Sequence, residues 1–124
     1  MNTGFKQLLA EANAVIETIS VHDALAMVDD PEVVFVDVRE GEERARGAIA
    51  HSVHAPRGFL EFIVDPESPM HNPTLAGDKR FVLYCASGGR STLAAKTLVD
   101  MGFEKVCHIA GGFAAWQEAN GPTE

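Results

Sequence analysis

Apolar residues recur with helical spacing at the start of the chain. Between residues 5 and 19 they fall every three or four positions, at Phe5, Leu8, Leu9, Ala12, Val15, Ile16 and Ile19. This spacing predicts an amphipathic helix over 5–19. Ser20, followed by Asp23, has the pattern of a capping box and predicts a second helix that continues to Val28.

Three continuous apolar runs follow, rich in β-branched and aromatic residues. Residues 33–38 (Val-Val-Phe-Val-Asp-Val) and 81–84 (Phe-Val-Leu-Tyr) are typical of strands buried on both faces, and 106–109 predicts a third, short strand. The remaining segments predict short helices over 40–46, 56–63, 91–101 and 112–119, and a proline-rich loop over 65–78. Strands that alternate with helices indicate one α/β domain, with a mostly parallel central sheet and helices on both faces.

The division of the chain follows from these patterns. Residues 1–18 are expected to form an N-terminal helical extension, 19–120 the domain, and 121–124 a short tail. A length of 124 residues with 46% hydrophobic composition fits one hydrophobic core. The oligomeric state is left open, because the N-terminal helix could pack on its own core or on a second subunit.

Charge and cysteine content restrict the classes of function. A formal net charge of -8 disfavours nonspecific binding to nucleic acid or to an anionic membrane. No apolar run approaches the roughly 20 residues that span a bilayer, and residues 1–10 lack the apolar segment of a secretory signal. Two cysteines do not suggest a disulfide scaffold, so reduced thiols and a cytoplasmic location are expected.

The strongest candidate for chemistry is Cys85, at the end of the second predicted strand. The residues between it and the next helix are small, and their backbone N–H groups can curl toward one point. The helix N-terminus and the Arg90 guanidinium add positive charge, which would stabilise a thiolate and hold an anion above it. The expected binding residues are Ala86, Ser87, Gly88, Gly89, Arg90 and Ser91.

This loop resembles the catalytic loop of single-domain rhodaneses, the Cys-x-x-Gly-x-Arg-Ser pattern being met by Cys85, Gly88, Arg90 and Ser91. Two further segments resemble the family, namely Asp37-Val38-Arg39-Glu40 and Gly111-Gly112-Phe113 with Trp116. In the middle of the chain, the family frame is kept at Gly47, Ile49, Val53 and Pro56, whereas the chain departs from it at Ala48, Ala50, His51 and Ser52.

The resemblance implies a rhodanese-like three-layer fold and a ping-pong sulfur transfer without a cofactor. The Cys85 thiolate would take the outer sulfur of a donor such as thiosulfate, and a thiophilic acceptor (cyanide in an assay, a thiol in the cell) would remove it. Arg90 would orient the donor or brace the loop, and Asp37 and Arg39 would support the loop. The implied partners are small sulfur-containing anions and thiols.

Two alternatives stay open. In a sulfur-relay or binding module, the loop would receive its persulfide from a protein partner. A thiol phosphatase or arsenate reductase is disfavoured, because related phosphatase folds place one more residue between the cysteine and the arginine than the four found here, Ala86 to Gly89. A phosphatase also needs a general acid, for which Asp65 and Glu67 are the nearest candidates.

The remaining polar residues have plainer interpretations. Arg57 either reaches the pocket mouth or is a solvated residue at the start of a helix. The spacing of the histidines fits no standard zinc site, so no metal is expected, although His71 is a candidate to line the pocket. Cys107 is expected in the core, with alternation along its strand turning either Cys107 or His108 inward. The acidic run Glu40, Glu42 and Glu43 is interpreted as a solvated face.

Overall fold

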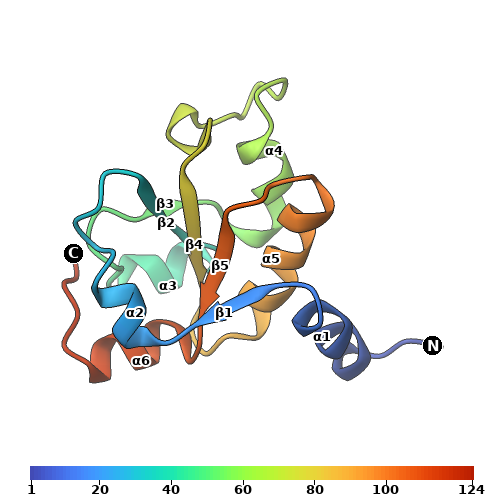
Figure 1. Ribbon diagram of the computed structural model, residues 1–124, viewed down its shortest axis with the longest axis horizontal. Helices are drawn as coiled ribbons and strands as arrows, with labels where there is room; N and C mark the ends of the chain where they lie inside the picture. The colour runs from blue at the N-terminus through green and yellow to red at the C-terminus, as the bar shows by residue number, and fades with distance from the viewer.

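A five-stranded parallel sheet forms the centre of the molecule in the computed structural model, which describes residues 1–124 (Figure 1). The strand order is β1-β5-β4-β2-β3, and every neighbouring pair is parallel. The strands are β1 (Glu17–Ile19), β2 (Val33–Asp37), β3 (Val53–His54), β4 (Arg80–Tyr84) and β5 (Val106–Ile109). Their carboxyl ends therefore share one edge of the sheet, where ligands bind in open α/β folds.

Helices cover both faces of this sheet, which confirms the predicted α/β architecture. One face is packed by α4 (Leu60–Val64) and α5 (Gly89–Asp100), with α1 (Phe5–Asn13) lying against α5. The other is packed by α2 (Val21–Leu25) and α6 (Gly112–Glu118). The short elements are α3 (Gly41–Ala45) and the 3₁₀ turns Arg57–Phe59 and Pro73–Leu75. No helix has the length and apolar character needed to cross a membrane.

Alternation along β4 divides the core into two clusters. Phe81, Leu83 and Cys85 pack on the α5 side, whereas Val82 and Tyr84 pack on the α6 side. All five are at most 1% exposed, as expected for a central strand covered on both faces. The side chain of Cys85 is thereby directed toward the helix that begins just after it.

The predicted helix over 5–19 is wrong in its second half. The helix ends at Asn13, and Glu17–Ile19 forms β1, which pairs with β5. Ile19 is buried there, but Val15, which kept the helical spacing, is 54% exposed. The expected boundary between residues 18 and 19 therefore falls inside a strand. The strand β3, which is only two residues long, was not predicted from the sequence.

Residues 121–124 are held against the domain. They run antiparallel to residues 48–50, with Ala48 and Glu124 exchanging backbone hydrogen bonds of 3.0 and 2.9 Å. The indole Nε1 of Trp116 donates to the Pro122 carbonyl at 2.9 Å. The segment expected as a tail thus closes over the last helix.

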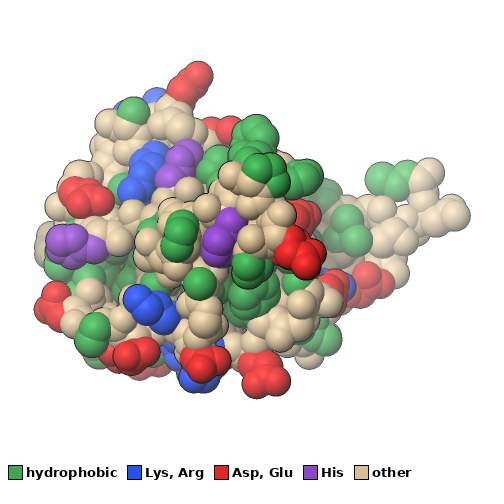
Figure 2. All heavy atoms as spheres, turned by 90° about the horizontal axis from the view of Figure 1, so that it is seen from above, with side chains coloured by type: hydrophobic (Ala, Val, Ile, Leu, Met, Phe, Trp, Pro, Cys, Tyr) green, Lys and Arg blue, Asp and Glu red, His purple; other side chains and the backbone are tan.

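The end of the molecule away from the carboxyl ends of the strands carries mixed side chains. Figure 2, which looks down from the top of Figure 1, shows acidic groups scattered around the rim and basic groups standing apart from one another. The proline-rich segment 65–78 lies at this end, whereas the turn between β4 and α5 lies at the bottom of Figure 1.

Candidate active site

The sulfur of Cys85 is the point on which the turn between β4 and α5 converges. The backbone N–H groups of Gly88 and Ser91 donate to Sγ at 3.1 and 3.4 Å. The Ser91 hydroxyl lies 3.5 Å from the same sulfur. Cys85 itself is 1% exposed, so these groups take the place of water around it.

These donors set the ionisation of the thiol. Burial acts to raise the pKa of Cys85, but the hydrogen bonds from the Ser91 hydroxyl and from the Ser91, Gly88 and Ser87 N–H groups outweigh it and lower the pKa below its ordinary value. Cys107 is the internal contrast, because burial and the nearby Glu17 carboxylate raise the pKa of that thiol to about 11. Cys107 packs in the core cluster beneath α6, as predicted.

The first turn of α5 fixes the shape of this loop. Gly88 precedes the helix with a φ of 120°, a backbone conformation that residues other than glycine rarely adopt. Its carbonyl accepts from the Thr92 hydroxyl at 2.7 Å and from the Thr92 N–H at 3.1 Å. The N–H groups of Gly89 and Arg90, in the first turn, have no acceptor within the helix and remain available as donors at its start.

The start of α6 holds the loop from the other side. The N–H of Phe113 donates to the Cys85 carbonyl at 2.8 Å, and that of Ala114 to the Ala86 carbonyl at 3.1 Å. Gly112 has a φ of +56°, and a Cβ there would lie 2.5 Å from the Cys85 oxygen. Glycine at this position therefore permits the close approach of α6 to the loop.

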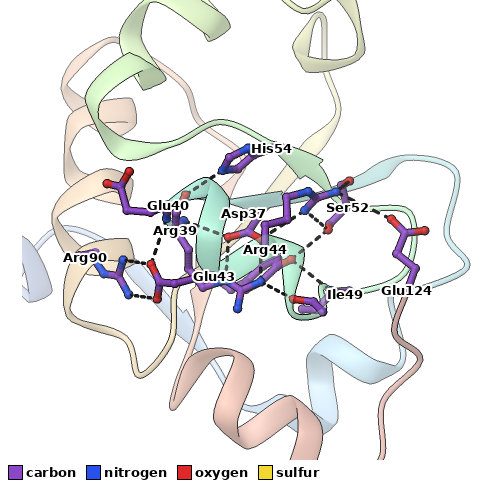
Figure 3. A network of polar contacts seen from close by, with 12 residues as sticks. Asp37, Arg39, Glu40, Glu43, Arg44, Ile49, Ser52, His54, Arg90 and Glu124 are labelled. Atoms are coloured by element: carbon purple, nitrogen blue, oxygen red, sulfur yellow. Dashed lines mark hydrogen bonds and ion pairs between the residues drawn. The ribbon is translucent and has the colours of Figure 1, made fainter.

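Arg90 is bound by Glu43 of α3 through a bidentate ion pair (Figure 3). The two nitrogen–oxygen distances are 2.6 and 2.9 Å. The bond from Arg90 lowers the pKa of Glu43 to about 2, and Glu43 in turn raises the pKa of Arg90. Glu43 was expected on a solvated face, and that expectation is wrong. Arg90 braces the loop against α3, and its charge is compensated by a carboxylate.

Asp37 and Arg39 form a buried pair behind the loop. Arg39 Nε and Nη2 donate to the two carboxylate oxygens of Asp37 at 3.0 and 2.9 Å, and Nη2 also donates to the Gly47 carbonyl. Burial acts to raise the pKa of Asp37, but the hydrogen bonds and charge of Arg39 hold it below the ordinary value. The Arg39 guanidinium lies 4.5 Å from the centroid of the Phe113 ring, so the pair reaches the loop through α6.

Arg44 and Ser52 extend this network, although no role was predicted for either residue from the sequence. Arg44 donates to Asp37 at 3.2 Å and to the Ser52 hydroxyl and carbonyl at 2.9 and 2.7 Å (Figure 3). The Ser52 hydroxyl also bonds to the Tyr84 hydroxyl at 2.9 Å. Ser52, one of the departures from the family frame, thus has a partner on β4.

A hollow of about 290 Å³ opens beside the loop. It is lined by Arg39, Glu43, Arg46, Ala86, Phe113 and Gln117. Arg46 is exposed and makes no ion pair, so it is the uncompensated cation at this opening. No signal in the sequence distinguished it from the other arginines.

The other candidate site residues from the sequence lie away from the Cys85 loop. Arg57 donates to Glu61 and Thr97, both at 3.0 Å, and lines a hollow that includes no residue of 85–91. His71 lies in the segment at the opposite end of the sheet, where its Nδ1 is 3.1 Å from the Ile63 carbonyl. Asp65 and Glu67 belong to that distant segment as well.

The other histidines do not assemble a metal site. His54 Nε2 lies 2.8 Å from the Arg39 carbonyl, and His51 adopts a φ of 64° in a turn. No three His, Cys, Asp or Glu side chains come together in a way that could hold a metal ion. On β5 both Cys107 and His108 are buried, because each face of this strand is covered. His108 faces Ser91.

Comparison with known proteins gives the family. Residues 20–119 match the model of the rhodanese-like domain. The candidate sulfurtransferase YtwF of Bacillus subtilis is 38% identical over 93 residues, which are 75% of this chain and 82% of that protein. A tRNA uridine(34) hydroxylase of Citrobacter koseri is 33% identical over 103 residues, which are 82% of this chain but only 29% of that longer protein.

Among solved structures, a protein of unknown function from Rhodopseudomonas palustris, described as a possible tyrosine phosphatase, is 49% identical. It superimposes with a TM-score of 0.94 over 100% of this chain and 96% of the other. The matched family model covers the Cys85 loop, the segment around Asp37 and the start of α6. The chain therefore belongs to the rhodanese-like domain family.

Proposed function

We propose that the protein is a sulfurtransferase that carries a sulfane sulfur on Cys85. The observation that carries the proposal is the convergence of the Gly88 and Ser91 N–H groups and the Ser91 hydroxyl on a buried sulfur whose pKa is lowered. A thiolate is the nucleophilic form of cysteine, and this loop favours it. The similarity to a candidate sulfurtransferase supports the same conclusion.

The first half-reaction loads the cysteine. The Cys85 thiolate attacks the outer sulfur of thiosulfate or a similar donor and forms an S–S bond. The bond between the two donor sulfurs breaks, and its electron pair leaves on sulfite. The terminal sulfur of the new persulfide is anionic, and the free N–H groups of Gly89 and Arg90 are the available donors to stabilise it.

The second half-reaction returns the free enzyme. The nucleophile of the acceptor, a thiolate or cyanide, attacks the terminal sulfur, and the electron pair of the broken S–S bond returns to the Cys85 sulfur. No proton has to be moved by a dedicated base when the thiol is already ionised. The hollow beside Ala86, with Arg46 at its opening, is the proposed approach for an anionic donor.

The description of the Rhodopseudomonas palustris neighbour as a possible tyrosine phosphatase makes a phosphatase the second candidate. Two features count against it. Only four residues, Ala86 to Gly89, separate Cys85 from Arg90, so the ring of backbone N–H groups is small and suits a single sulfur atom better than a tetrahedral phosphate. The candidate acids Asp65 and Glu67 lie at the opposite end of the sheet (Figure 1). Without a general acid, the leaving group would depart unprotonated.

Mass spectrometry of the intact protein tests the proposal. Incubation with thiosulfate should add the mass of one sulfur atom at Cys85, and subsequent cyanide should remove it as thiocyanate. Cys107→Ser should behave like the natural protein, and Cys85→Ser should take up no sulfur. A free thiol that no sulfur donor modifies, neither thiosulfate and other small donors nor a persulfidated protein, would contradict the proposal. Hydrolysis of an aryl phosphate that is lost in Cys85→Ser would favour the phosphatase.

The sulfur-relay alternative differs from a sulfurtransferase that uses small donors in the source of its sulfur. A relay module would remain unloaded by thiosulfate but would accept sulfur rapidly from a persulfidated protein. A panel of small donors beside a persulfidated protein donor, read at Cys85, therefore distinguishes the two forms of the proposal.

A further inference from the structure

His108 connects the reactive loop to the surface of the molecule. It lies on β5, is 4% exposed, and faces α5. Its Nδ1 is 2.9 Å from the Ser91 hydroxyl, and its Nε2 is 2.9 Å from the hydroxyl of Thr18 on β1. Since Ser91 Oγ lies 3.5 Å from Cys85 Sγ, four side chains form a continuous chain from the buried sulfur to the exposed Thr18.

The direction of these bonds decides what Ser91 can do. Its hydroxyl has one proton and three neighbouring acceptors, namely the Cys85 thiolate, His108 Nδ1 and the Gly88 carbonyl at 3.2 Å. The Gly88 carbonyl already accepts two bonds from Thr92. A thiolate is charged and is therefore a stronger acceptor than this neutral, already shared carbonyl. The competition that remains lies between the sulfur and the histidine.

The tautomer of His108 determines whether the Ser91 hydroxyl donates to the sulfur or to the histidine. A neutral imidazole donates from one nitrogen and accepts at the other. When Nδ1 carries the proton, it donates to Ser91 Oγ, Nε2 accepts from Thr18, and the Ser91 proton is left for the thiolate. When Nε2 carries the proton, Ser91 donates to Nδ1 instead, and the sulfur loses its hydroxyl donor.

The surroundings keep the ring neutral. Burial lowers the pKa of His108, and no carboxylate contacts the ring. The charged groups on the neighbouring elements are paired with one another, Glu17 of β1 with Arg80 of β4 at 3.1 Å, and Arg90 of α5 with Glu43. The titratable thiols nearby are Cys85, at the other end of the chain of bonds, and Cys107, which packs on the opposite face of β5.

We propose that His108 is a positioning residue that holds the Ser91 hydroxyl as a donor to the Cys85 thiolate and, with Thr18, gives the thiol proton a path to solvent. In the thiol state the bonds run from Cys85 through Ser91 and His108 to Thr18. On ionisation, the S–H proton passes to Ser91 Oγ, the Ser91 proton to Nδ1, the Nε2 proton to Thr18, and the Thr18 proton to water. The electron pair stays on sulfur, and the imidazole is neutral before and after.

The inference rests on the proposed role of Cys85 as the nucleophile, and alkylation measures that ionisation without any sulfur donor. The rate of alkylation of Cys85 by iodoacetamide is measured against pH, with the product read on the Cys85 peptide. His108→Phe keeps an aromatic ring at this position but has no hydrogen-bonding nitrogen. It should raise the midpoint by about one pH unit, which lowers the alkylation rate about tenfold at pH values below the midpoint. His108→Asn keeps an N–H near the Nδ1 position and should retain the midpoint of the natural protein.

An unshifted His108→Phe profile would overturn the proposal. So would a His108→Asn profile shifted as far as that of His108→Phe, because loss of packing alone would then account for both. If His108→Phe does not fold, the exposed Thr18→Val decides, since loss of the Nε2 partner should raise the midpoint in the same direction and an unchanged midpoint would overturn the proposal. Thiosulfate loading, measured in parallel, reports the proposed function separately. A protein that takes no sulfur but shows the shift fails only as a sulfurtransferase.

Discussion

The pKa values of the two buried cysteines are shifted in opposite directions, and the difference lies in the hydrogen-bond donors around Cys85. Cys85 is 1% exposed and Cys107 is 0% exposed, so removal from water acts on both thiols. Around Cys85, N–H and hydroxyl donors reverse the effect, whereas the pKa of Cys107 rises to about 11. A reactive thiol is therefore defined here by its donors rather than by its exposure.

Replacement of Ser91 by alanine should raise the pKa of Cys85, because it removes the one side-chain donor to the sulfur. A hydrogen bond to a charged group contributes about 1.5–3 kcal/mol, which corresponds to an increase of about one to two pH units. The pH profile of Cys85 alkylation checks this. Ser87→Ala is the matched control, since the Ser87 side chain is exposed and only its backbone N–H serves the thiol.

The Glu43–Arg90 pair should make a pH-dependent contribution to stability. Pairing lowers the pKa of Glu43 from 4.5 to about 2, so the contribution is fully present above pH 4.5 and is lost as the pH falls through about 2. Because Arg90 is 41% and Glu43 24% exposed, the contribution is only about 0.2–1 kcal/mol. The difference in unfolding free energy between the natural protein and Glu43→Gln should follow this course in denaturant titrations. A difference that grows toward low pH would contradict it.

Arg46 should affect the reaction of Cys85 with charged sulfur donors but not its reaction with neutral reagents. It carries the uncompensated positive charge at the hollow beside Ala86, so Arg46→Ala should raise the KM for thiosulfate several-fold and leave alkylation by neutral iodoacetamide unchanged. Steady-state thiocyanate formation measures the first quantity. Lys79→Ala, at a hollow without any residue of the loop, is the control that should change neither.

At the scale of elements, the loop is clamped between two helix starts. The α5 start supplies the donors, and the α6 start binds the carbonyls of Cys85 and Ala86. The approach of α6 depends on Gly112. Contacts from the starts of two separate helices are therefore needed to shape a loop of seven residues.

Gly112→Ala should push α6 away from the loop. The added Cβ would meet the Cys85 carbonyl oxygen at 2.5 Å and the φ of +56° disfavours alanine, so we expect a loss of about 1–3 kcal/mol of unfolding free energy. Alkylation of Cys85 should slow at neutral pH as the donors shift. Gly58→Ala, where a Cβ meets nothing within 4 Å, should leave both quantities unchanged.

The sequence predicted the elements that carry their own signal and missed those that depend on distant partners. The runs at 33–38 and 81–84 are strands because their side chains are apolar on both faces. The segment 17–19 could not be recognised, since its apolar spacing fits a helix and only pairing with β5 makes it a strand. Glu43 and His108 were missed for the same reason, because their partners Arg90 and Ser91 are 47 and 17 positions away.

At the scale of the whole molecule, the two ends of the chain complete the fold. β1 enters the sheet only through β5, and residues 121–124 pair with residues 48–50. The Trp116 indole is bound by the Pro122 carbonyl. Hydrogen bonds thus make residues 121–124 part of the folded domain, although their sequence carries no regular pattern.

Removal of residues 121–124 should lower the unfolding free energy by about 2–4 kcal/mol. It deletes several backbone hydrogen bonds and the acceptor of the Trp116 indole, each with a net value of about 0.5–1.5 kcal/mol. Chemical denaturation followed by the fluorescence of the single tryptophan measures the loss. Removal of residues 1–3, which are exposed and lie before α1, should leave the midpoint where it was.

The clamp formed by Phe113 and Ala114 also has a consequence during synthesis. A ribosome makes Cys85 well before it makes these two residues, so the nascent chain carries its thiol ahead of the groups that lock the loop. Until α6 has emerged and docked, Cys85 should react like the thiol of an ordinary unfolded peptide. If the protein acts as proposed, sulfur loading is confined to chains that have been translated beyond α6, and a chain that stalls before residue 112 should not act as a persulfide carrier.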